Sequence, residues 1–327
     1  MGETTGVEWT DHTGNIVIGC ERISQACRDC YAARERITGV LEAQMSEREG
    51  RRVKLWGPAD STPRYVTKGW EKNLLAWDRA ARRKGVRRRA FFCSLSDILE
   101  AHPTCDTVRP HAFEVFASLT NIDVQALTKR PENIRRMVPP AWLESWPAHV
   151  WIGTTVEDQE NAERRIPHLL AVPAPVRFLS VEPQIGPVDL TDLILHDGAP
   201  GEAHYSALDC DVDPEDDGDW NGARIAWVIC GGESGSKARP FDLAWARSLR
   251  DQCRTAGVPF FLKQLGANVA TDMSVDDARR ERLTLTERLD DVGARIMDGR
   301  WRLRLVDSHG GDESEWPADL RNCRAFP

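Results

Sequence analysis

Three cysteines near the amino terminus have the residue type and spacing of a metal or cluster site. Cys20, Cys27 and Cys30 fall within eleven residues, in the pattern C-x6-C-x2-C. Cysteine thiolates are soft ligands that suit iron–sulfur clusters or zinc. The C-x2-C end can direct two sulfurs to one centre, whereas the six-residue gap needs a loop that folds back, which Gly19 and Ser24 favour.

The number of cysteines separates two kinds of site. A structural zinc ion takes four protein ligands, whereas a 4Fe–4S cluster held by three cysteines leaves one iron open. S-adenosylmethionine (SAM) can chelate that iron, accept one electron into its sulfonium and break to give a 5′-deoxyadenosyl radical. We therefore expect a 4Fe–4S cluster and SAM as cofactors. The alternatives are zinc held by the three cysteines with His12 or a distant residue, three unligated cysteines, and a redox pair of Cys27 and Cys30.

Composition and charge bound the class of protein. The chain has 327 residues, 41% hydrophobic and 29% charged, which is enough to bury a sizeable core. Its net charge of -8 does not by itself indicate a nucleic-acid binder. The segment Met1–Thr13 is polar, and no apolar run approaches the length of a membrane span. We therefore expect a cytoplasmic protein with no membrane contact and with reduced thiols.

A short apolar run, then a polar cluster, then a helical stretch recurs along the chain. Continuous apolar runs suit strands that are buried on both faces of a parallel sheet. The predicted strands are 15–19, 90–93, 123–127, 150–153, 176–179, 225–230 and 258–262, and the predicted helices are 29–37, 70–84, 110–119, 131–137, 158–170 and 243–256. This alternation predicts an α/β fold, a complete or partial TIM-like (β/α) barrel with mostly parallel strands. A doubly wound open sheet is the rival.

Three stretches break this rhythm. Residues 39–67 are charged and irregular, and we expect them to pack near the cysteines as an insertion. Residues 197–222 are acidic and rich in Gly and Pro, which favours a mobile loop over a calcium site, because Asp216 stands where an EF-hand needs glycine. We predict a barrel over 1–270 that carries these two insertions, and a helical and irregular extension over 271–327.

Polar residues follow almost every predicted strand. Active sites of (β/α) barrels lie at the C-terminal ends of the strands, so parallel strands would bring these side chains to one mouth. They are Cys20, Asp97, Lys129, Arg130, Thr155, Glu157, Ser180, Glu182, Glu233, Ser234, Lys263 and Gln264. Asp97, Glu157 and Ser180 are also placed to cap helices. Capping does not explain the lysines and Arg130, since a cation near a helix N-terminus is unfavourable.

The chemistry of these side chains suggests their roles. Glycines let the backbone approach a ligand closely, so Gly231, Gly232, Glu233 and Ser234 are predicted to contact SAM or substrate. The cations suit the SAM carboxylate or an anionic substrate such as a phosphate. Glu182 is expected to hold a ribose or to act as an acid or base, and Glu182 and Lys263 are the predicted catalytic residues. The cofactor-binding set is completed by Asp97, Lys129, Arg130, Thr155, Glu157 and Ser180.

A basic stretch precedes the second predicted strand. Its seven cations are Arg79, Arg82, Arg83, Lys84, Arg87, Arg88 and Arg89. Cations at a helix C-terminus are favourable, so a solvated helix end is one interpretation. The other is contact with a nucleic-acid backbone. Combined with radical chemistry, the second interpretation indicates modification or repair of a nucleobase, nucleotide or nucleic acid.

Several blocks of sequence together resemble a family of phage and bacterial proteins with a three-Cys motif. The blocks are Val7–Asp11, Gly19–Tyr31, Ser94–Asp97, Leu127–Pro131, Gly153–Glu157, Phe178–Pro183, Gly231–Gly235 and Phe261–Gln264, in family order within residues 7–270. That family resembles radical-SAM enzymes, with the spore-photoproduct-lyase relatives nearest. The resemblance implies a 4Fe–4S cluster, SAM and a reductase or flavodoxin-type electron donor. The spacing C-x6-C-x2-C departs from the C-x3-C-x2-C of ordinary radical-SAM proteins.

Two rival functions use the same fold. One is a zinc-binding, non-redox protein that binds nucleic acid or catalyses hydrolysis. The other is a binding partner without catalysis, in which the cysteines act as a structural staple. Metal analysis separates iron with sulfide from zinc, and loss of folding on replacement of Cys27 would indicate the staple.

Overall fold

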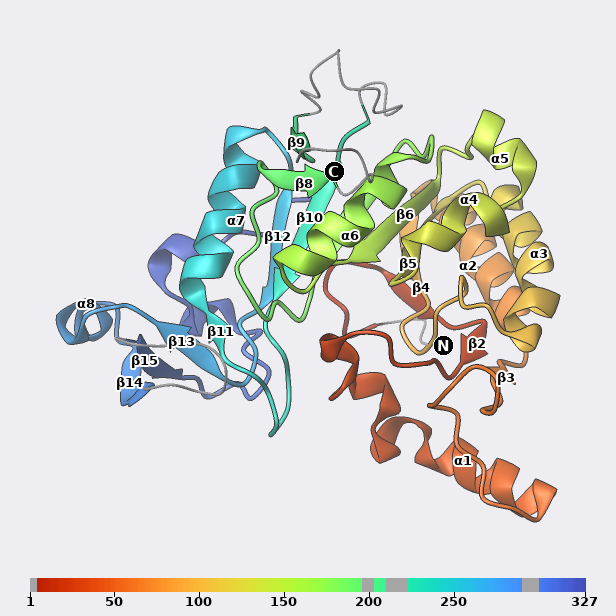
Figure 1. Ribbon diagram of the computed structural model, residues 1–327, viewed down its shortest axis with the longest axis horizontal. Helices are drawn as coiled ribbons and strands as arrows, with labels where there is room; N and C mark the ends of the chain where they lie inside the picture. Colours follow the sequence, from red (N-terminus) through yellow and green to blue (C-terminus); the bar gives the residue numbers. More distant parts are fainter. Residues whose placement is uncertain (1–4, 196–202, 210–222, 290–299) are drawn as a thin grey trace. The chain divides into compact units, whose positions relative to one another are not determined.

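Strand–helix alternation produces a half-barrel in the computed structural model, which describes residues 5–195, 203–209, 223–289 and 300–327. Seven strands form an all-parallel, curled sheet flanked by helices, in the order β1-β4-β5-β6-β7-β10-β12 (Figure 1). Their bounds are β1 (His12–Gly14), β4 (Arg88–Phe92), β5 (Ile122–Thr128), β6 (Val150–Thr155), β7 (Arg177–Val181), β10 (Trp227–Gly231) and β12 (Phe260–Gln264). The prediction of a partial TIM-like barrel is confirmed.

The chain divides into two compact units, each built from two segments of sequence. The first unit comprises Met1–Thr155 and Arg165–Phe178, and the second comprises Val156–Arg164 and Leu179–Pro327. The predicted extension, 271–327, therefore belongs to the second unit. Of the predicted acidic insertion, only 203–209 lies within the described residues.

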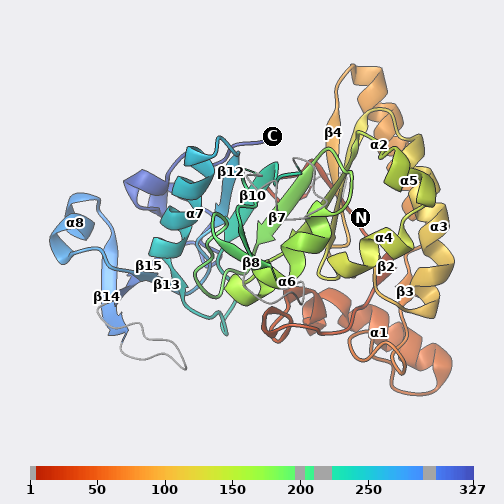
Figure 2. The ribbon, with the colours of Figure 1, turned by 45° about the horizontal axis from the view of Figure 1, so that its top comes forward.

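Helices with one apolar stripe cover the sheet of the first unit. In α2 (Trp70–Lys84) the buried residues Trp70, Leu74, Trp77 and Ala81 recur at helical spacing, and Gly85 ends the helix with a φ of 63°. The helix α3 (Pro103–Ser118) also packs against this sheet. The ring centroid of its Phe116 lies 5.0 Å from that of Phe92 on β4. Figure 2 shows both helices together with α4 (Ile134–Met137) and α5 (Pro140–Glu144) beside β4.

The α3 helix begins earlier than the sequence predicts. Its predicted start was Pro110, which instead lies inside the helix. His102 caps the helix by accepting a hydrogen bond from the Thr104 amide, and Pro103 occupies the first turn, where a missing N–H costs nothing.

The first predicted strand, 15–19, is wrong in position. The sheet strand is β1, and the chain bends at Asn15, whose side chain bonds to Ser94 Oγ and to the Leu95 amide. Val17 and Ile18 form β2 (Val17–Ile18), which pairs antiparallel with β3 (Tyr65–Val66). The apolar run is therefore buried, but outside the main sheet.

The predicted helix at 29–37 and the irregular insertion at 39–67 are also revised. The segment that holds the three cysteines, residues 20–30, is called the cysteine loop. Two short turns of 3-10 helix, Gln25–Cys27 and Tyr31–Ala33, form its second half and its end, and α1 (Glu35–Glu49) follows. Its terminal Gly50 has a φ of 65°. A helix thus occupies the first part of the stretch that the charge pattern indicated to be irregular.

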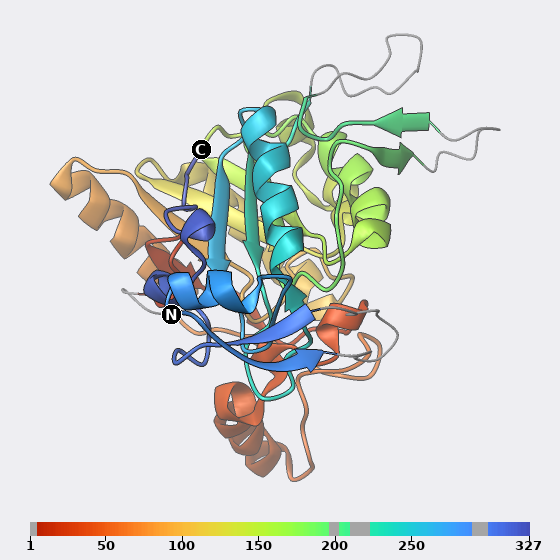
Figure 3. The same cartoon turned by 90° about the vertical axis from the view of Figure 1, so that its left-hand side faces the viewer.

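The second unit contains α7 (Leu243–Thr255), which contacts β10 and β12 and follows the sequence prediction closely (Figure 3). Asp242 caps it by accepting a hydrogen bond of 2.9 Å from the Ala244 amide, and Gly257 follows with a φ of 66°. The remaining elements are α6 (Gln159–Leu170), β8 (Leu193–Leu195), β9 (Ala203–Tyr205), β11 (Phe241–Asp242), β13 (Val269–Thr271), α8 (Val275–Arg280), β14 (Thr284–Leu289) and β15 (Arg300–Arg304).

The C-terminal part is more regular than the sequence predicts. A second sheet has the order β11-β13-β15-β14, in which β15 pairs antiparallel with both β13 and β14. Arg300 on β15 forms an ion pair of 2.8 Å with Asp242, the residue that caps α7. The charged segment after residue 270 is therefore built into a sheet.

Candidate functional site

The cysteine loop leaves the sheet at its carboxyl edge. Gly19 forms a parallel bridge with Ser96, and its amide donates to the Leu95 carbonyl at 3.0 Å, so the chain runs on beside the loop that follows β4. Gly19 has a φ of +107°, and a Cβ there would lie 2.4 Å from the Leu55 carbonyl oxygen. Only glycine fits both conditions, which places Cys20 directly after a tightly held backbone.

A neighbouring segment holds Cys20 from a second side. Cys20 forms a parallel bridge with Trp56, and the Gly57 amide donates to the Cys20 carbonyl. Glu42 of α1 anchors this segment by accepting hydrogen bonds from the Leu55 amide and the Lys54 ammonium, at 2.9 and 2.6 Å. The expectation that residues 39–67 pack near the cysteines agrees with these contacts.

Cys27 and Cys30 lie one turn apart, in surroundings that shift the pKa of their thiols in opposite directions. The Cys30 amide donates to the Cys27 carbonyl, and the Ser24 hydroxyl lies 3.5 Å from the Cys27 sulfur. Burial acts to raise the pKa of the Cys27 thiol, but the Lys129 ammonium and hydrogen bonds from Ser24 outweigh it, so this pKa is lowered. Burial raises the pKa of Cys30, and the adjacent Cys27 thiolate adds to the rise. Cys27 is therefore the thiol that ionises first.

A buried ion pair lies behind the loop. Arg64 and Glu100 have side chains that are 0% and 1% exposed, and two guanidinium N–H groups donate to the two carboxylate oxygens at 2.8 and 2.9 Å. Arg64 also donates to the Leu55 and Gly57 carbonyls, and Glu100 accepts from the Glu21 amide at 2.9 Å. The pair thus joins residues 54–57, here called the Trp56 segment, to Glu21, the residue that follows Cys20.

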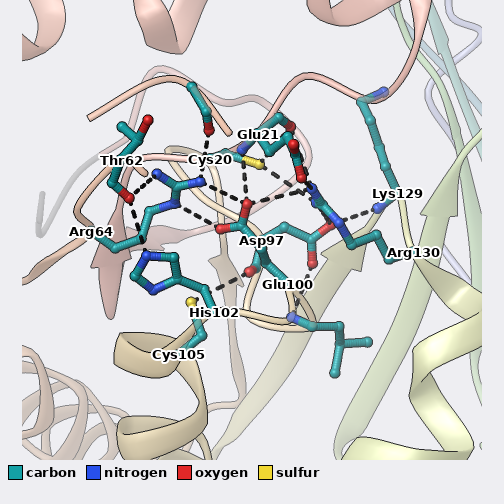
Figure 4. Close-up of polar contacts among 12 residues, drawn as sticks. Cys20, Glu21, Thr62, Arg64, Asp97, Glu100, His102, Cys105, Lys129 and Arg130 are labelled. Atoms are coloured by element: carbon teal, nitrogen blue, oxygen red, sulfur yellow. Dashed lines mark hydrogen bonds and ion pairs between the residues drawn. The ribbon is translucent and has the colours of Figure 1, made fainter. Parts of the chain in front are cut away.

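A second buried pair contacts Cys20 itself. Arg130 donates to Asp97 at 3.2 Å, to the Cys20 sulfur at 3.6 Å and to the Glu21 carbonyl at 3.4 Å (Figure 4). Asp97 also accepts from the Thr128 hydroxyl. Burial, reinforced by the Asp97 carboxylate, raises the pKa of Cys20, while Arg130 acts in the opposite direction. Burial acts to lower the pKa of Arg130, but Asp97 and Cys20 outweigh it, so the guanidinium keeps its charge.

The structure brings three of the predicted cofactor-binding residues to this loop. Asp97 and Arg130 are 4% and 6% exposed and bind each other, whereas Lys129 is half-buried and lies near Cys27 and Cys30. Asp97 does not cap α3, whose cap is His102. Thr155, the last residue of β6, is buried, and its carbonyl accepts from Arg165.

The strand ends of the second unit form their own polar group. Lys263 and Glu182 form an ion pair of 2.5 Å, with side chains 21% and 16% exposed. Gly231 lies beside this pair, because a Cβ there would lie 3.5 Å from the Glu182 carboxyl carbon and 3.3 Å from the Gln264 carbonyl oxygen. The Gln184 amide donates to the Gly231 carbonyl, which fixes the segment after Glu182 to β10.

The glycine-rich segment after β10 is closely packed. A Cβ on Gly232 would lie 2.2 Å from the Leu265 carbonyl oxygen. Glu233 is 8% exposed, and its carboxylate accepts from the Arg239 guanidinium at 2.9 and 3.0 Å and from the Arg239 amide at 3.0 Å. Ser234 is half-buried. The Gly232 amide donates to the Gln264 carbonyl, the Gly232 carbonyl accepts from the Gln264 side chain, and the Glu233 carbonyl accepts from the Ala267 amide, so the backbone of this segment is held within the protein.

The backbone carbonyls of Glu157 and Ser180 form hydrogen bonds to neighbouring segments. The Glu157 carbonyl accepts from the Ile185 amide, and the Ser180 carbonyl accepts from the Val156 amide. Both side chains are buried, at 0% and 4% exposure. The amino end of α6 is capped by Asp158, which accepts from the Asn161 amide, so Glu157 does not cap it.

Sequence reasoning missed Arg64 and Glu100. They are 36 residues apart, one in a stretch without periodicity and the other after the Ser94–Asp97 block. No local pattern joins them, because the contact arises only when the Trp56 segment folds back onto the cysteine loop.

The donor set has the type and number of ligands for a three-cysteine cluster. All eight cysteines within the described residues are free thiols. Within the same residues, no three His, Cys, Asp or Glu side chains converge closely enough to hold a single metal ion. A four-iron cluster binds each cysteine at a different iron atom, so its ligands need not meet at one point as those of one zinc ion must. No described helix has the length and apolar character needed to cross a membrane.

Comparisons with known proteins identify a family and two distant structures. A family model described as "Protein of unknown function (DUF5131)" matches residues 4–302. No curated protein matches the chain. A solved structure of spore photoproduct lyase complexed with dinucleoside spore photoproduct is 9% identical, with 92% of this chain and 70% of that chain covered and a TM-score of 0.37. A cysteine-to-serine mutant of spore photoproduct lyase has the same identity and coverage, with a TM-score of 0.38.

Proposed function

The chain belongs to the DUF5131 family, and from its cysteine loop we propose that it is a radical-SAM-like iron–sulfur enzyme that modifies or repairs a nucleobase, nucleotide or nucleic acid. Cys20, Cys27 and Cys30 are the proposed ligands of a 4Fe–4S cluster. When bound, such a cluster supplies one electron that breaks the sulfonium bond of SAM, giving methionine and a 5′-deoxyadenosyl radical. A reductase or flavodoxin-type protein is the proposed electron donor.

The observation that carries this proposal is the position of the three cysteines. They lie on a loop that runs beyond the carboxyl edge of a parallel half-barrel, where barrel enzymes place their reactive groups. One thiol of the three has a lowered pKa, and thiolates are the form that binds iron. The half-buried Lys129 lies near two of them and offsets the negative charge of a ligated cluster.

The strand-end residues have proposed roles in binding and proton transfer. Gly231, Gly232 and Glu233 are proposed to line the SAM site, with the Glu233 carboxylate held in place by Arg239. Glu182 and Lys263 are proposed to hold the ribose or move a proton, since their ion pair is partly exposed and can exchange its partner for a ligand. Lys129, Thr155, Glu157, Ser180 and Ser234 remain proposed contributors to the cofactor site.

The proposed nucleic-acid class of substrate rests on the basic stretch. Arg79, Arg82, Arg83 and Lys84 are exposed along the end of α2. Arg87 and Arg88 are paired with Asp123 and Asp11. The exposed group presents positive charge that a phosphate backbone would neutralise.

Anaerobic purification with iron and acid-labile sulfide analysis tests the proposal. We expect a brown protein that forms 5′-deoxyadenosine from SAM after dithionite reduction. Cys27→Ala and Cys30→Ala should lose iron and SAM cleavage, whereas Cys323→Ala, which removes another half-buried thiol, should keep both. A colourless protein with stoichiometric zinc that is inert toward SAM after reconstitution would contradict the proposal and support the zinc alternative.

A further inference from the structure

Arg130 is placed to act on a cluster through one of its ligands. Its guanidinium donates to the Cys20 sulfur at 3.6 Å, and the side chain is only 8% exposed. We propose that Arg130 is a positioning residue that keeps this N–H···S hydrogen bond when Cys20 ligates the cluster, and thereby makes the cluster easier to reduce. This inference rests on the proposed iron–sulfur function.

The orientation of Arg130 is fixed by groups that do not depend on a ligand. Asp97 accepts from Arg130 Nη1 at 3.2 Å, and the same carboxylate accepts from the Lys129 amide at 3.0 Å. The Thr128 hydroxyl donates to Asp97 and accepts from the Arg130 amide at 2.9 Å. The end of β5 therefore carries the guanidinium on a rigid support that aims it at Cys20.

The other end of the guanidinium is held by the loop and by Glu100. Arg130 Nη2 lies 3.4 Å from the Glu21 carbonyl and 3.5 Å from Glu100 Oε1. Glu100 is in turn held by Arg64 and by the Glu21 amide. Arg130 thus contacts both Cys20 and the residue after it, so the side chain sets the position of the sulfur as well as its surroundings.

The balance of charges gives the direction of the effect. Arg64 and Arg130 are buried with Asp97 and Glu100, so two cations meet two anions before any ligand binds. Reduction adds one electron to the cluster, supplied by dithionite in the test, and the added negative charge is stabilised by a nearby cation and by hydrogen bonds to the cysteine sulfur. Loss of the Arg130 N–H groups should therefore make reduction harder.

This role differs from the binding of the SAM carboxylate that the sequence suggested for Arg130. The guanidinium already contacts Asp97, Glu100, the Glu21 carbonyl and the Cys20 sulfur. Binding SAM would require Arg130 to leave buried acceptors, which is costly. The half-buried Lys129 is the better candidate for that carboxylate.

The test compares reconstituted wild-type protein with Arg130→Gln and Arg130→Lys. The readouts are the midpoint potential from redox titration followed by electron paramagnetic resonance, and the Kd of SAM. We expect Arg130→Gln to shift the reduction equilibrium about tenfold toward the oxidised form, which is about 59 mV for a one-electron couple. Arg130→Lys should shift it less, because the charge remains. Arg136→Gln, an exposed cation in the same unit, should leave the potential unchanged.

The outcomes separate this inference from the proposed function. A lower potential with an unchanged Kd of SAM supports it, and Arg130→Lys alone carries the comparison where Arg130→Gln does not fold. An unchanged potential in variants that hold a full cluster overturns the role of Arg130 and leaves the function standing. A weakened Kd at unchanged potential assigns Arg130 to SAM instead. Failure of the wild-type protein to hold any iron–sulfur cluster overturns both.

Discussion

Arg64 and Glu100 form a two-bonded ion pair from which water is almost completely excluded, with side chains 0% and 1% exposed. The pair lies directly behind the residue that follows Cys20, because Glu100 accepts the Glu21 amide. Removing one partner of such a pair leaves an uncompensated buried charge. The stability of the cysteine loop is therefore coupled to a contact made far from it in the sequence.

Glu100→Gln should destabilise the protein in a pH-dependent way. Burial acts to raise the pKa of Glu100, but Arg64 outweighs it, so the folded pKa lies below the ordinary 4.5. The pair therefore contributes stability above pH 4.5 that is lost as the pH falls through the lowered folded pKa. At pH 7 we expect the variant to lose about 3–5 kcal/mol of unfolding free energy.

Urea denaturation between pH 7 and pH 3 measures this difference. The difference between the two proteins should shrink as the pH falls below 4.5, because Glu100 of the unfolded wild type takes up a proton there. Asp106→Asn, which alters a carboxylate that is 55% exposed and pairs with Arg109, serves as the control and should show a small difference at all pH values. A constant difference for Glu100→Gln across the range would contradict the assignment.

Gly19→Ala should damage the cysteine loop more than an equivalent change elsewhere. Gly19 and Gly85 both have positive φ, but a Cβ on Gly85 meets nothing within 4 Å, whereas one on Gly19 meets the Leu55 carbonyl oxygen at 2.4 Å. Gly85→Ala should cost about 1 kcal/mol from backbone strain. Gly19→Ala should cost about 1–3 kcal/mol more and lower the iron content. Urea denaturation measures the stability cost of each substitution, and iron analysis measures the cluster content. Equal costs for the two variants would show that the Leu55 carbonyl moves aside for the new methyl group.

Glu182→Gln and Lys263→Met should separate stability from activity. Their ion pair is partly exposed, so breaking it should change the unfolding free energy by about 1 kcal/mol. Formation of 5′-deoxyadenosine should fall at least tenfold if the pair binds SAM or moves a proton. Arg254→Met removes a cation that is 73% exposed in the same unit and should leave turnover unchanged. Full turnover in both pair variants would remove them from the proposed site.

Arg82→Gln and Arg83→Gln should weaken binding of a single-stranded oligonucleotide. Each lost phosphate contact should reduce the slope of log K against log salt by about 0.7. Arg87→Gln, whose side chain is already paired with Asp123, should change that slope less. Titrations by fluorescence anisotropy at several salt concentrations measure the slopes. Identical slopes in all proteins would favour the solvated helix end.

Local sequence patterns were sufficient to predict many of the strands and helices. The runs at 123–127 and 225–230 correspond to β5 and β10, because strands buried on both faces need continuous apolar sequence. Asp242 and Gly257 mark the ends of α7 because capping depends on neighbours in the chain.

The errors arose where tertiary contacts decide. The run 15–19 is apolar, but the side-chain bonds of Asn15 turn it out of the sheet. In the site, Asp97 and Arg130 were recognised as polar strand-end residues, but their mutual pairing was not, because it depends on how β4 and β5 align. Arg64 carried no local signal at all.

The interleaving of the two units constrains how this gene can be cut or recombined. A break after residue 155 would deprive the first unit of Arg165–Phe178, and a break after residue 178 would deprive the second of Val156–Arg164. A break between those points leaves at least one unit without part of its chain. No single cut of the chain therefore yields both units with all of their residues.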